Sequence, residues 1–227
     1  MLHGAVRPRV CVLCCSPFLC VLRVERLVVR TLVLASSNPG KLREIVQILA
    51  PLGIEAVPQS AYGVPKVDEP HDTFLENALA KARHASRATG LAALADDSGI
   101  CVPTLDGAPG VQSARFAGEP KSDARNNEKL VALMRDKADR RAYYYCVMVL
   151  TRSPGDPTPV VADARWHGEV VLDPRGANGF GYDPHFLLPE LGKTAAELES
   201  GHKNRISHRG RALAHLVAQL RAQRDEG

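Results

Sequence analysis

Apolar residues along this chain occur in two patterns, short runs typical of strands and repeats at helical spacing. Residues 27–35 form a β-branched, largely apolar run typical of an interior strand, and residues 42–52 then repeat apolar side chains at helical spacing. The same patterns predict strands at residues 54–57, 92–95, 142–150 and 160–172, and helices over residues 74–88, 129–137 and 204–223. The two long strands flank a turn at residues 153–157, which indicates an antiparallel pair.

The turn between the first strand and the first helix carries the sequence SSNPGK at residues 36–41. Asn38 suits the N-cap of the helix and Pro39 its first position, so free backbone N–H groups, the helix dipole and Lys41 together predict a phosphate site. A Walker A loop is excluded, because Ala35 replaces its leading glycine and Leu42 its hydroxyl residue. A capped helix with an exposed lysine remains the alternative.

Two adjacent carboxylates follow the strand predicted at residues 92–95. Asp96 and Asp97 precede Ser98 and Gly99, so the strand is expected to end on the two acids. Paired acids at the end of a buried strand are costly to desolvate unless Mg²⁺ or an Arg/Lys cluster neutralises them. Glu69, just before the helix over residues 74–88, is the candidate partner of Asp97. The alternative is that one aspartate caps a turn and the other is solvated.

The second half of the chain adds an aromatic, glycine-rich loop at residues 176–183 and three basic residues, Lys203, His208 and Arg209, at the start of the last helix. Cations neutralise a polyphosphate, acids hold Mg²⁺, an aromatic ring stacks on a base, and one carboxylate activates water for in-line attack. Each residue alone has a plainer explanation, such as a core phenylalanine, a surface histidine or a solvated lysine. Only the combination predicts this chemistry.

Composition narrows the choice of partners. The 227 residues carry a net charge of +4 with a sequence pI near 8.8, and aromatic residues make up 5%. This aromatic content is too low for a groove that stacks the bases of single-stranded nucleic acid. No apolar run in the sequence approaches the ~18 residues of a membrane span. We expect neither nucleic acid nor membrane as a partner.

Four of the six cysteines lie within residues 1–27, which we interpret as an N-terminal extension outside the functional domain. A metal site there lacks a second pair of ligands, and a signal peptide lacks a cleavage site with small residues. The rest of the chain has the low cysteine content of a reducing compartment, so we expect a cytoplasmic protein.

Six segments occur in the order found in the inosine/xanthosine triphosphate pyrophosphatase (Ham1-like) family. They are residues 36–41 (SSNPGK), 73–77 (TFLEN), 95–99 (ADDSG), 107–110 (GAPG), 179–184 (GFGYDP) and 207–210 (SHRG). The chain resembles this family over residues 28–220, with a domain expected at residues 28–222.

The resemblance implies an elongated, two-lobed α/β fold with a mixed, strongly twisted central sheet flanked by helices and an active cleft between the lobes. It also implies a homodimer that uses Mg²⁺ to hydrolyse ITP, dITP and XTP to the monophosphate and pyrophosphate. This reaction would keep deaminated purines out of DNA and RNA.

The resemblance also assigns roles to residues of this chain. Asp97 would accept a proton and, with Glu69, bind the metal. Substrate contacts would come from the turn Ser36, Ser37, Asn38, Pro39, Gly40 and Lys41, from Ser98, from Phe180, Gly181, Tyr182 and Asp183, and from Lys203, His208 and Arg209. His208 and Arg209 would read the purine. The competing functions are a P-loop ATPase or kinase and a nucleotide- or RNA-binding protein without turnover.

Overall fold

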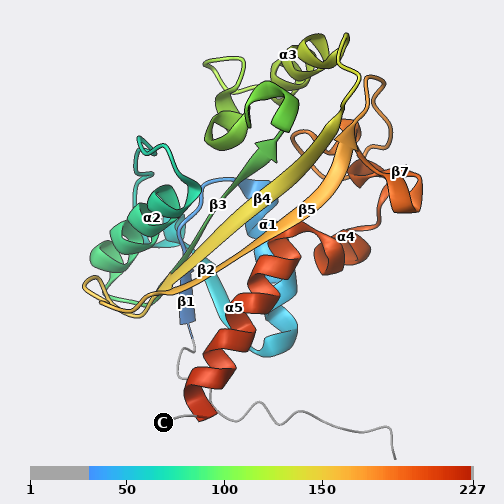
Figure 1. The fold of residues 1–227 in the computed structure, drawn as a ribbon. Coiled ribbons are helices and arrows are strands. Elements are labelled where there is room, and N and C mark those ends of the chain that lie inside the picture. Colours follow the sequence, from blue (N-terminus) through green and yellow to red (C-terminus); the bar gives the residue numbers. More distant parts are fainter. Residues whose placement is uncertain (1–30, 226–227) are drawn as a thin grey trace, which may run out of the picture.

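The computed structural model describes residues 31–225, which form one mixed sheet and the helices around it (Figure 1). The seven strands lie in the order β2-β1-β3-β4-β5-β6-β7. Their bounds are β1 Thr31–Leu34, β2 Glu55–Pro58, β3 Ala93–Cys101, β4 Arg141–Thr151, β5 Val160–Val170, β6 Phe186–Leu188 and β7 Lys193–Thr194. β1 is parallel to β2 and β3, and each later neighbour is antiparallel. The predicted α/β fold with a mixed sheet is confirmed.

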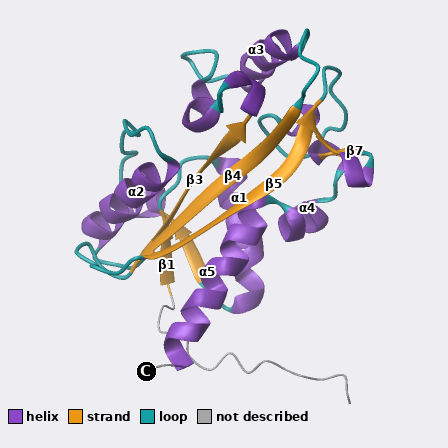
Figure 2. Cartoon of the chain, in the orientation of Figure 1, coloured by secondary structure: helices purple, strands orange, loops and turns teal. Residues whose placement is uncertain are grey.

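Helices cover both faces of the sheet. The bounds are α1 Pro39–Leu49, α2 Phe74–Thr89, α3 Asp123–Met134, α4 Ser200–Ile206 and α5 His208–Asp225. One core cluster joins β1, β3, β4 and β5 to α1 and α5, and a second cluster joins the other face to the alanine-rich side of α2. Figure 2 shows these helices on opposite sides of the long strands.

A third cluster builds the far end of the molecule. The long strands β3, β4 and β5 run on beyond α2, and their distal halves pack with α3 and β6 around Tyr144, Trp166 and Phe186 (Figure 1). The chain is therefore elongated, with two lobes that share the same three strands. The parallel strands β1 and β2 belong to the first lobe alone, and the turn after β1 consequently lies where the second lobe begins.

Two of the predicted secondary-structure elements are wrong at the site. β3 does not end before the acids but continues to Cys101, because β4 pairs with it in register throughout and cations neutralise the carboxylates. The last helix is not continuous. Ser207 has φ −70° and ψ 163°, an extended conformation that separates α4 from α5.

Other predicted elements differ only at their ends. α3 begins at Asp123, earlier than expected, because the Ser122 side chain accepts the Arg125 N–H as an N-cap. Strand β1 covers Thr31–Leu34, and residues 27–30 lie outside the described part, as does the extension predicted at residues 1–27. Within residues 31–225, no helix is both long and apolar enough to cross a bilayer.

Candidate active site

The turn after β1 is held by its own side chains. Asn38 Oδ1 accepts the N–H groups of Gly40 at 2.8 Å and Lys41 at 3.2 Å, and Ser36 Oγ accepts the Asn38 N–H. The helix cap is confirmed, but the prediction of free N–H groups is wrong here, because Asn38 itself satisfies two of them. The Lys41 ammonium is the charge that this turn offers, and its Nζ lies 3.1 Å from Asp96 Oδ2.

Strand alternation sends the two adjacent aspartates to opposite faces of the sheet. Asp96 faces α1 and α5, with Leu94 on the same side, whereas Asp97 faces α2, with Ala95 on its side. Because each carboxylate has its own basic partners, the pair does not form a single diacid centre.

Asp96 is the centre of a buried network of charges on the α5 side. Its Oδ2 lies 3.1 Å from Lys41 Nζ and 3.1 Å from Arg209 Nη2. Arg209 Nη1 in turn binds Glu44 on α1. Burial raises the pKa of Asp96, but Lys41 and Arg209 outweigh it and hold the pKa well below its usual range. Arg209 is 1% exposed, and the acids around it raise its pKa despite burial, so it stays charged.

Lys203 extends this network to the aromatic loop. Its Nζ lies 2.8 Å from Glu44 Oε1 and 2.6 Å from Asp183 Oδ2. Asp183 also accepts the Tyr144 hydroxyl at 3.2 Å and the Phe180 N–H at 2.9 Å. We call Lys41, Glu44, Asp96, Asp183, Lys203 and Arg209 the buried ion network. It joins α1, β3, the loop before β6, α4 and α5.

On the α2 side, two carboxylates share one lysine. Lys81 Nζ lies 2.6 Å from Glu69 Oε1 and 3.0 Å from Asp97 Oδ1, and we call Glu69 and Asp97 the acid pair. Burial lowers the pKa of Lys81, but Asp97, Asp96 and Glu69 outweigh it and raise that pKa above its usual value. Burial raises the pKa of Glu69, but Lys81 and Lys41 outweigh it and lower that pKa. Lys81 and Glu69 are therefore both charged at neutral pH.

The acid pair fits a magnesium ion by the chemistry and placement of its donors. Two carboxylate oxygens from different elements already converge on one cation, the Lys81 ammonium. Among residues 31–225, no cluster of three or more His, Cys, Asp or Glu side chains is arranged for a metal. Mg²⁺ at phosphate sites is commonly held by one or two carboxylates together with substrate phosphates, so a pair of acids is sufficient.

A pocket opens on the α5 side beside the buried ion network. It encloses about 550 Å³, including space open to solvent, between the turn after β1, the middle of β3, the start of α3, the loop before β6 and the start of α5. The predicted residues that line it are Asn38, Lys41, Ser98, Phe180, Gly181, Tyr182, Asp183, Lys203, His208 and Arg209. Neither member of the acid pair does.

Phe180 lies inside this pocket. A Cβ on Gly40 would come 2.5 Å from Phe180 Cδ1, so the ring packs directly on the first turn of α1. Lys203 Nζ lies 5.0 Å and Arg209 Cζ 5.8 Å from the ring centroid, within cation–π range. The ring thus stands between the phosphate turn and the basic residues of α4 and α5.

His208 lines the pocket as a neutral imidazole. Burial, Arg209 and Lys203 together hold its pKa well below the usual value. The imidazole stacks on the Tyr144 ring, with centroids 4.6 Å apart and an interplanar angle of 8°. Its Nδ1 is buried and has no hydrogen-bond partner among residues 31–225, so this atom can serve a ligand.

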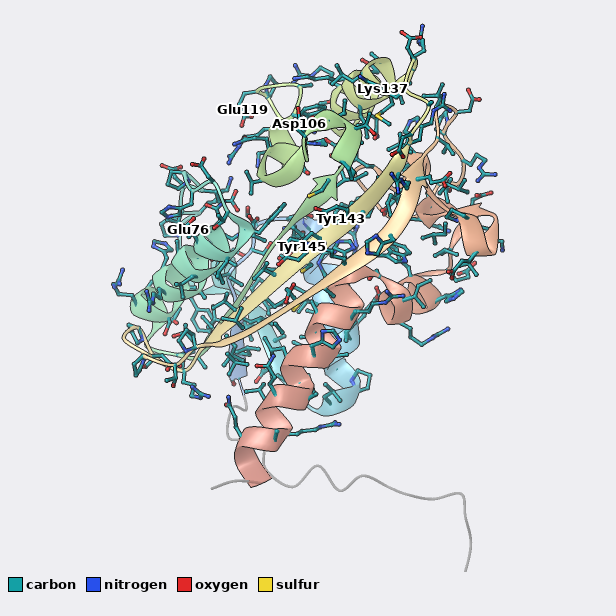
Figure 3. The ribbon with its side chains drawn as sticks, viewed as in Figure 1. Glu76, Asp106, Glu119, Lys137, Tyr143 and Tyr145 are labelled. Atoms are coloured by element: carbon teal, nitrogen blue, oxygen red, sulfur yellow. The ribbon has the colours of Figure 1, made fainter. Side chains whose placement is uncertain are left out.

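The sequence analysis missed several residues of the site, among them Lys81, Glu44 and Tyr144. Lys81 lies on the inner face of α2, at helical spacing from Ala78 and Ala85, and Glu44 follows Gly40 by four residues on the buried face of α1. That spacing was the available signal in both cases. Tyr143 and Tyr145, which are labelled in Figure 3, alternate with Tyr144 along β4 and therefore face the other side of the sheet. Strand alternation alone does not mark Tyr144 as a pocket residue.

Comparison with known proteins identifies the family of this chain. The sequence profile described as the Ham1 family matches residues 32–219. The chain belongs to the Ham1 family. The predicted resemblance is thereby confirmed.

Relatives of this family match almost over their full lengths. The dITP/XTP pyrophosphatase of Nitrosomonas europaea is 67% identical over 83% of this chain and 93% of its own, and that of Aromatoleum aromaticum is 64% identical over 83% and 96%. A HAM1 protein from Coxiella burnetii superposes with a TM-score of 0.78 at 46% identity, covering 85% of this chain and 98% of its own. The Ham1 protein of Staphylococcus aureus gives 0.75 at 39% identity, with coverage of 85% and 99%.

Proposed function

We propose that this protein hydrolyses deaminated purine nucleoside triphosphates, namely dITP, ITP and XTP, to the monophosphate and pyrophosphate. The enzyme is a nucleoside-triphosphate pyrophosphatase, a hydrolase acting on an acid anhydride. One observation carries the proposal: an acid pair fit for a divalent cation lies one residue along β3 from a cation-rich pocket with an aromatic ring. The relatives from Nitrosomonas europaea and Aromatoleum aromaticum are named dITP/XTP pyrophosphatases, which supports dITP and XTP as substrates.

In this proposal the turn at residues 36–41 binds the triphosphate, and Asp97 positions the attacking water. Lys41 binds phosphate oxygens, Glu69 and Asp97 hold Mg²⁺, and the bound ion supplies positive charge that neutralises the phosphates. Water attacks the α-phosphorus, its proton passes to the Asp97 carboxylate, and the bond from that phosphorus to the α,β-bridging oxygen breaks as pyrophosphate leaves. Ser98, which accepts Arg209 Nη2 at 2.8 Å, lies beside this path.

Base selection depends on hydrogen-bond donors, because a 6-oxo purine offers a carbonyl oxygen where adenine offers an amino group. Arg209 has five N–H donors, and four of its N–H bonds go to Asp96, Glu44 and Ser98. One N–H of Nη1 remains for a ligand among the residues described. Together with His208, it rejects adenine by leaving donors unpaired. The N–H groups of Phe180, Gly181 and Asp183 are already bound within the protein.

The cellular setting follows from this activity. We propose that the protein acts in the cytoplasm as a homodimer and removes deaminated triphosphates before they enter DNA or RNA. Light scattering of the full chain tests the assembly state, for which we expect a mass of twice 24.5 kDa.

A panel of nucleotides tests the function. ITP, dITP, XTP, ATP and GTP are each incubated with Mg²⁺, and pyrophosphate and orthophosphate are measured separately. We expect pyrophosphate from the first three and little turnover of ATP. Orthophosphate from ATP would instead show an ATPase, and binding without turnover would show a nucleotide-binding protein.

A further inference from the structure

The loop that carries Phe180 is attached to α3 by contacts that the proposed function does not use. The Gly181 N–H donates to Asp123 Oδ2 at 2.9 Å, and the Asn127 side-chain amide donates to the Gly181 carbonyl at 2.9 Å. Asp123 and Asn127 are four residues apart on α3, so they lie on one face of the helix. Both the backbone N–H and the backbone carbonyl of Gly181 are therefore held by one turn of α3.

This attachment fixes a segment that is otherwise free to rotate. Gly179 has φ +76° and Gly181 has φ +62°, a backbone region that glycine enters without the steric cost of a Cβ. Phe180 lies between them, and its N–H donates to Asp183 Oδ2. Asp183 thus fixes the chain at Phe180, and α3 fixes it immediately afterwards.

The position of the Phe180 ring decides how the pocket is divided. The ring touches the first turn of α1 at Gly40 on one side and lies over Lys203 and Arg209 on the other. A shift of the loop moves the ring away from the place where a base has to bind, but it leaves Lys41 and the acid pair untouched.

We propose that Asp123 and Asn127 are positioning residues for the nucleotide base. They hold the Gly181 peptide so that Phe180 presents its ring to the base, and they make no contribution to binding of the phosphates. This inference rests on the proposed function, because it assumes a nucleotide in the pocket.

The variants D123A, D123N and N127A separate this role from a general effect on α3. D123A and D123N both remove the carboxylate charge at the start of the helix, but asparagine keeps an oxygen that accepts the Gly181 N–H. E128A, at an exposed position on the same helix, is the matched control. Calorimetry in EDTA compares ITP with inorganic tripolyphosphate, which carries the phosphate charges without a base, and steady-state assays with Mg²⁺ add KM and kcat for ITP.

We expect D123A and N127A to weaken ITP binding and raise its KM by ~3- to 10-fold, the effect of about one lost hydrogen bond. Tripolyphosphate binding and kcat stay unchanged, and D123N stays close to the wild type.

The proposal is overturned if ITP binding is unchanged in D123A, if tripolyphosphate binding weakens in parallel, or if D123N behaves like D123A. A wild type that binds ITP in this calorimetry but releases no pyrophosphate refutes the proposed function alone. A wild type that binds no ITP refutes both.

Discussion

The two faces of β3 hold their charges in different balance. On the α5 side, the buried ion network sets three cations against three carboxylates: Lys41, Lys203 and Arg209 against Glu44, Asp96 and Asp183. On the α2 side, Lys81 is the one ion-pair partner of the acid pair among residues 31–225. The first face is a balanced scaffold that shapes a pocket, and the second has one carboxylate in excess. Positive charge from a divalent cation is therefore accommodated more readily beside α2.

We expect the largest effect from a substitution that removes the carboxylate needed by the proposed mechanism on the α2 side. Asp97→Asn should lower turnover of ITP by ~10²–10⁴-fold, the contribution of a general base. The melting temperature should change little, because asparagine has the same shape. Asp163→Asn, at an exposed position on β5, is the control, and near-normal turnover by Asp97→Asn would move the role to Asp96 or Glu69.

The next largest effect is expected when Arg209 is removed from the buried ion network on the α5 side. Arg209→Met leaves Asp96 and Glu44 buried without their shared partner, which costs about 3–5 kcal/mol of the free energy of unfolding. Denaturant unfolding of this variant measures the loss, and Arg211→Met, an exposed arginine of the same helix, should lie within ~0.5 kcal/mol of the wild type. A stable Arg209→Met protein would show that the network contributes to recognition alone.

A change at Lys81 tests the excess negative charge of the acid pair. Lys81→Met should lower the unfolding free energy by about 1–3 kcal/mol in EDTA, less than full burial would give because Glu69 and Asp97 retain some solvent contact. Added Mg²⁺ should then raise the melting temperature of this variant more than that of the wild type, since the ammonium no longer competes with the ion. Arg87→Met on α2 is the control, and an equal Mg²⁺ shift in all three proteins would place the metal elsewhere.

The smallest effect is the pH dependence of stability that His208 contributes on the α5 side. The pKa of His208 in the folded protein is depressed below its ordinary 6.5, so the unfolded chain binds a proton that the folded chain refuses. Stability should therefore fall as pH drops below about 6.5, by up to ~1.4 kcal/mol per pH unit from this residue. His208→Gln should flatten that slope between pH 6.5 and 5, and His215→Gln, on the exposed side of α5, should not. An unchanged slope in His208→Gln would mean that His208 is charged in the fold.

The local signals that led to correct predictions are short in range. The N-cap at Asn38, the helix that starts after Thr73 and the alternation along β5 each depend on residues within a turn or a strand of one another. The strand end at residue 95 was predicted wrongly, because nothing near Asp96 in the sequence shows that β4 and two distant cations hold it inside the sheet.

The sequence by itself determined the alternation of strands and helices, the turn with Lys41, and the residue types from which a nucleotide site is made, because propensity, capping and spacing are local properties. Tertiary structure alone decided which charges meet. It sent Asp96 and Asp97 to opposite faces, brought Lys81 between Glu69 and Asp97, and paired Glu44 with Arg209 across 165 positions of sequence. The physical reason is that charge pairing in a low-dielectric interior depends on distances that are fixed only when the sheet and its helices close together.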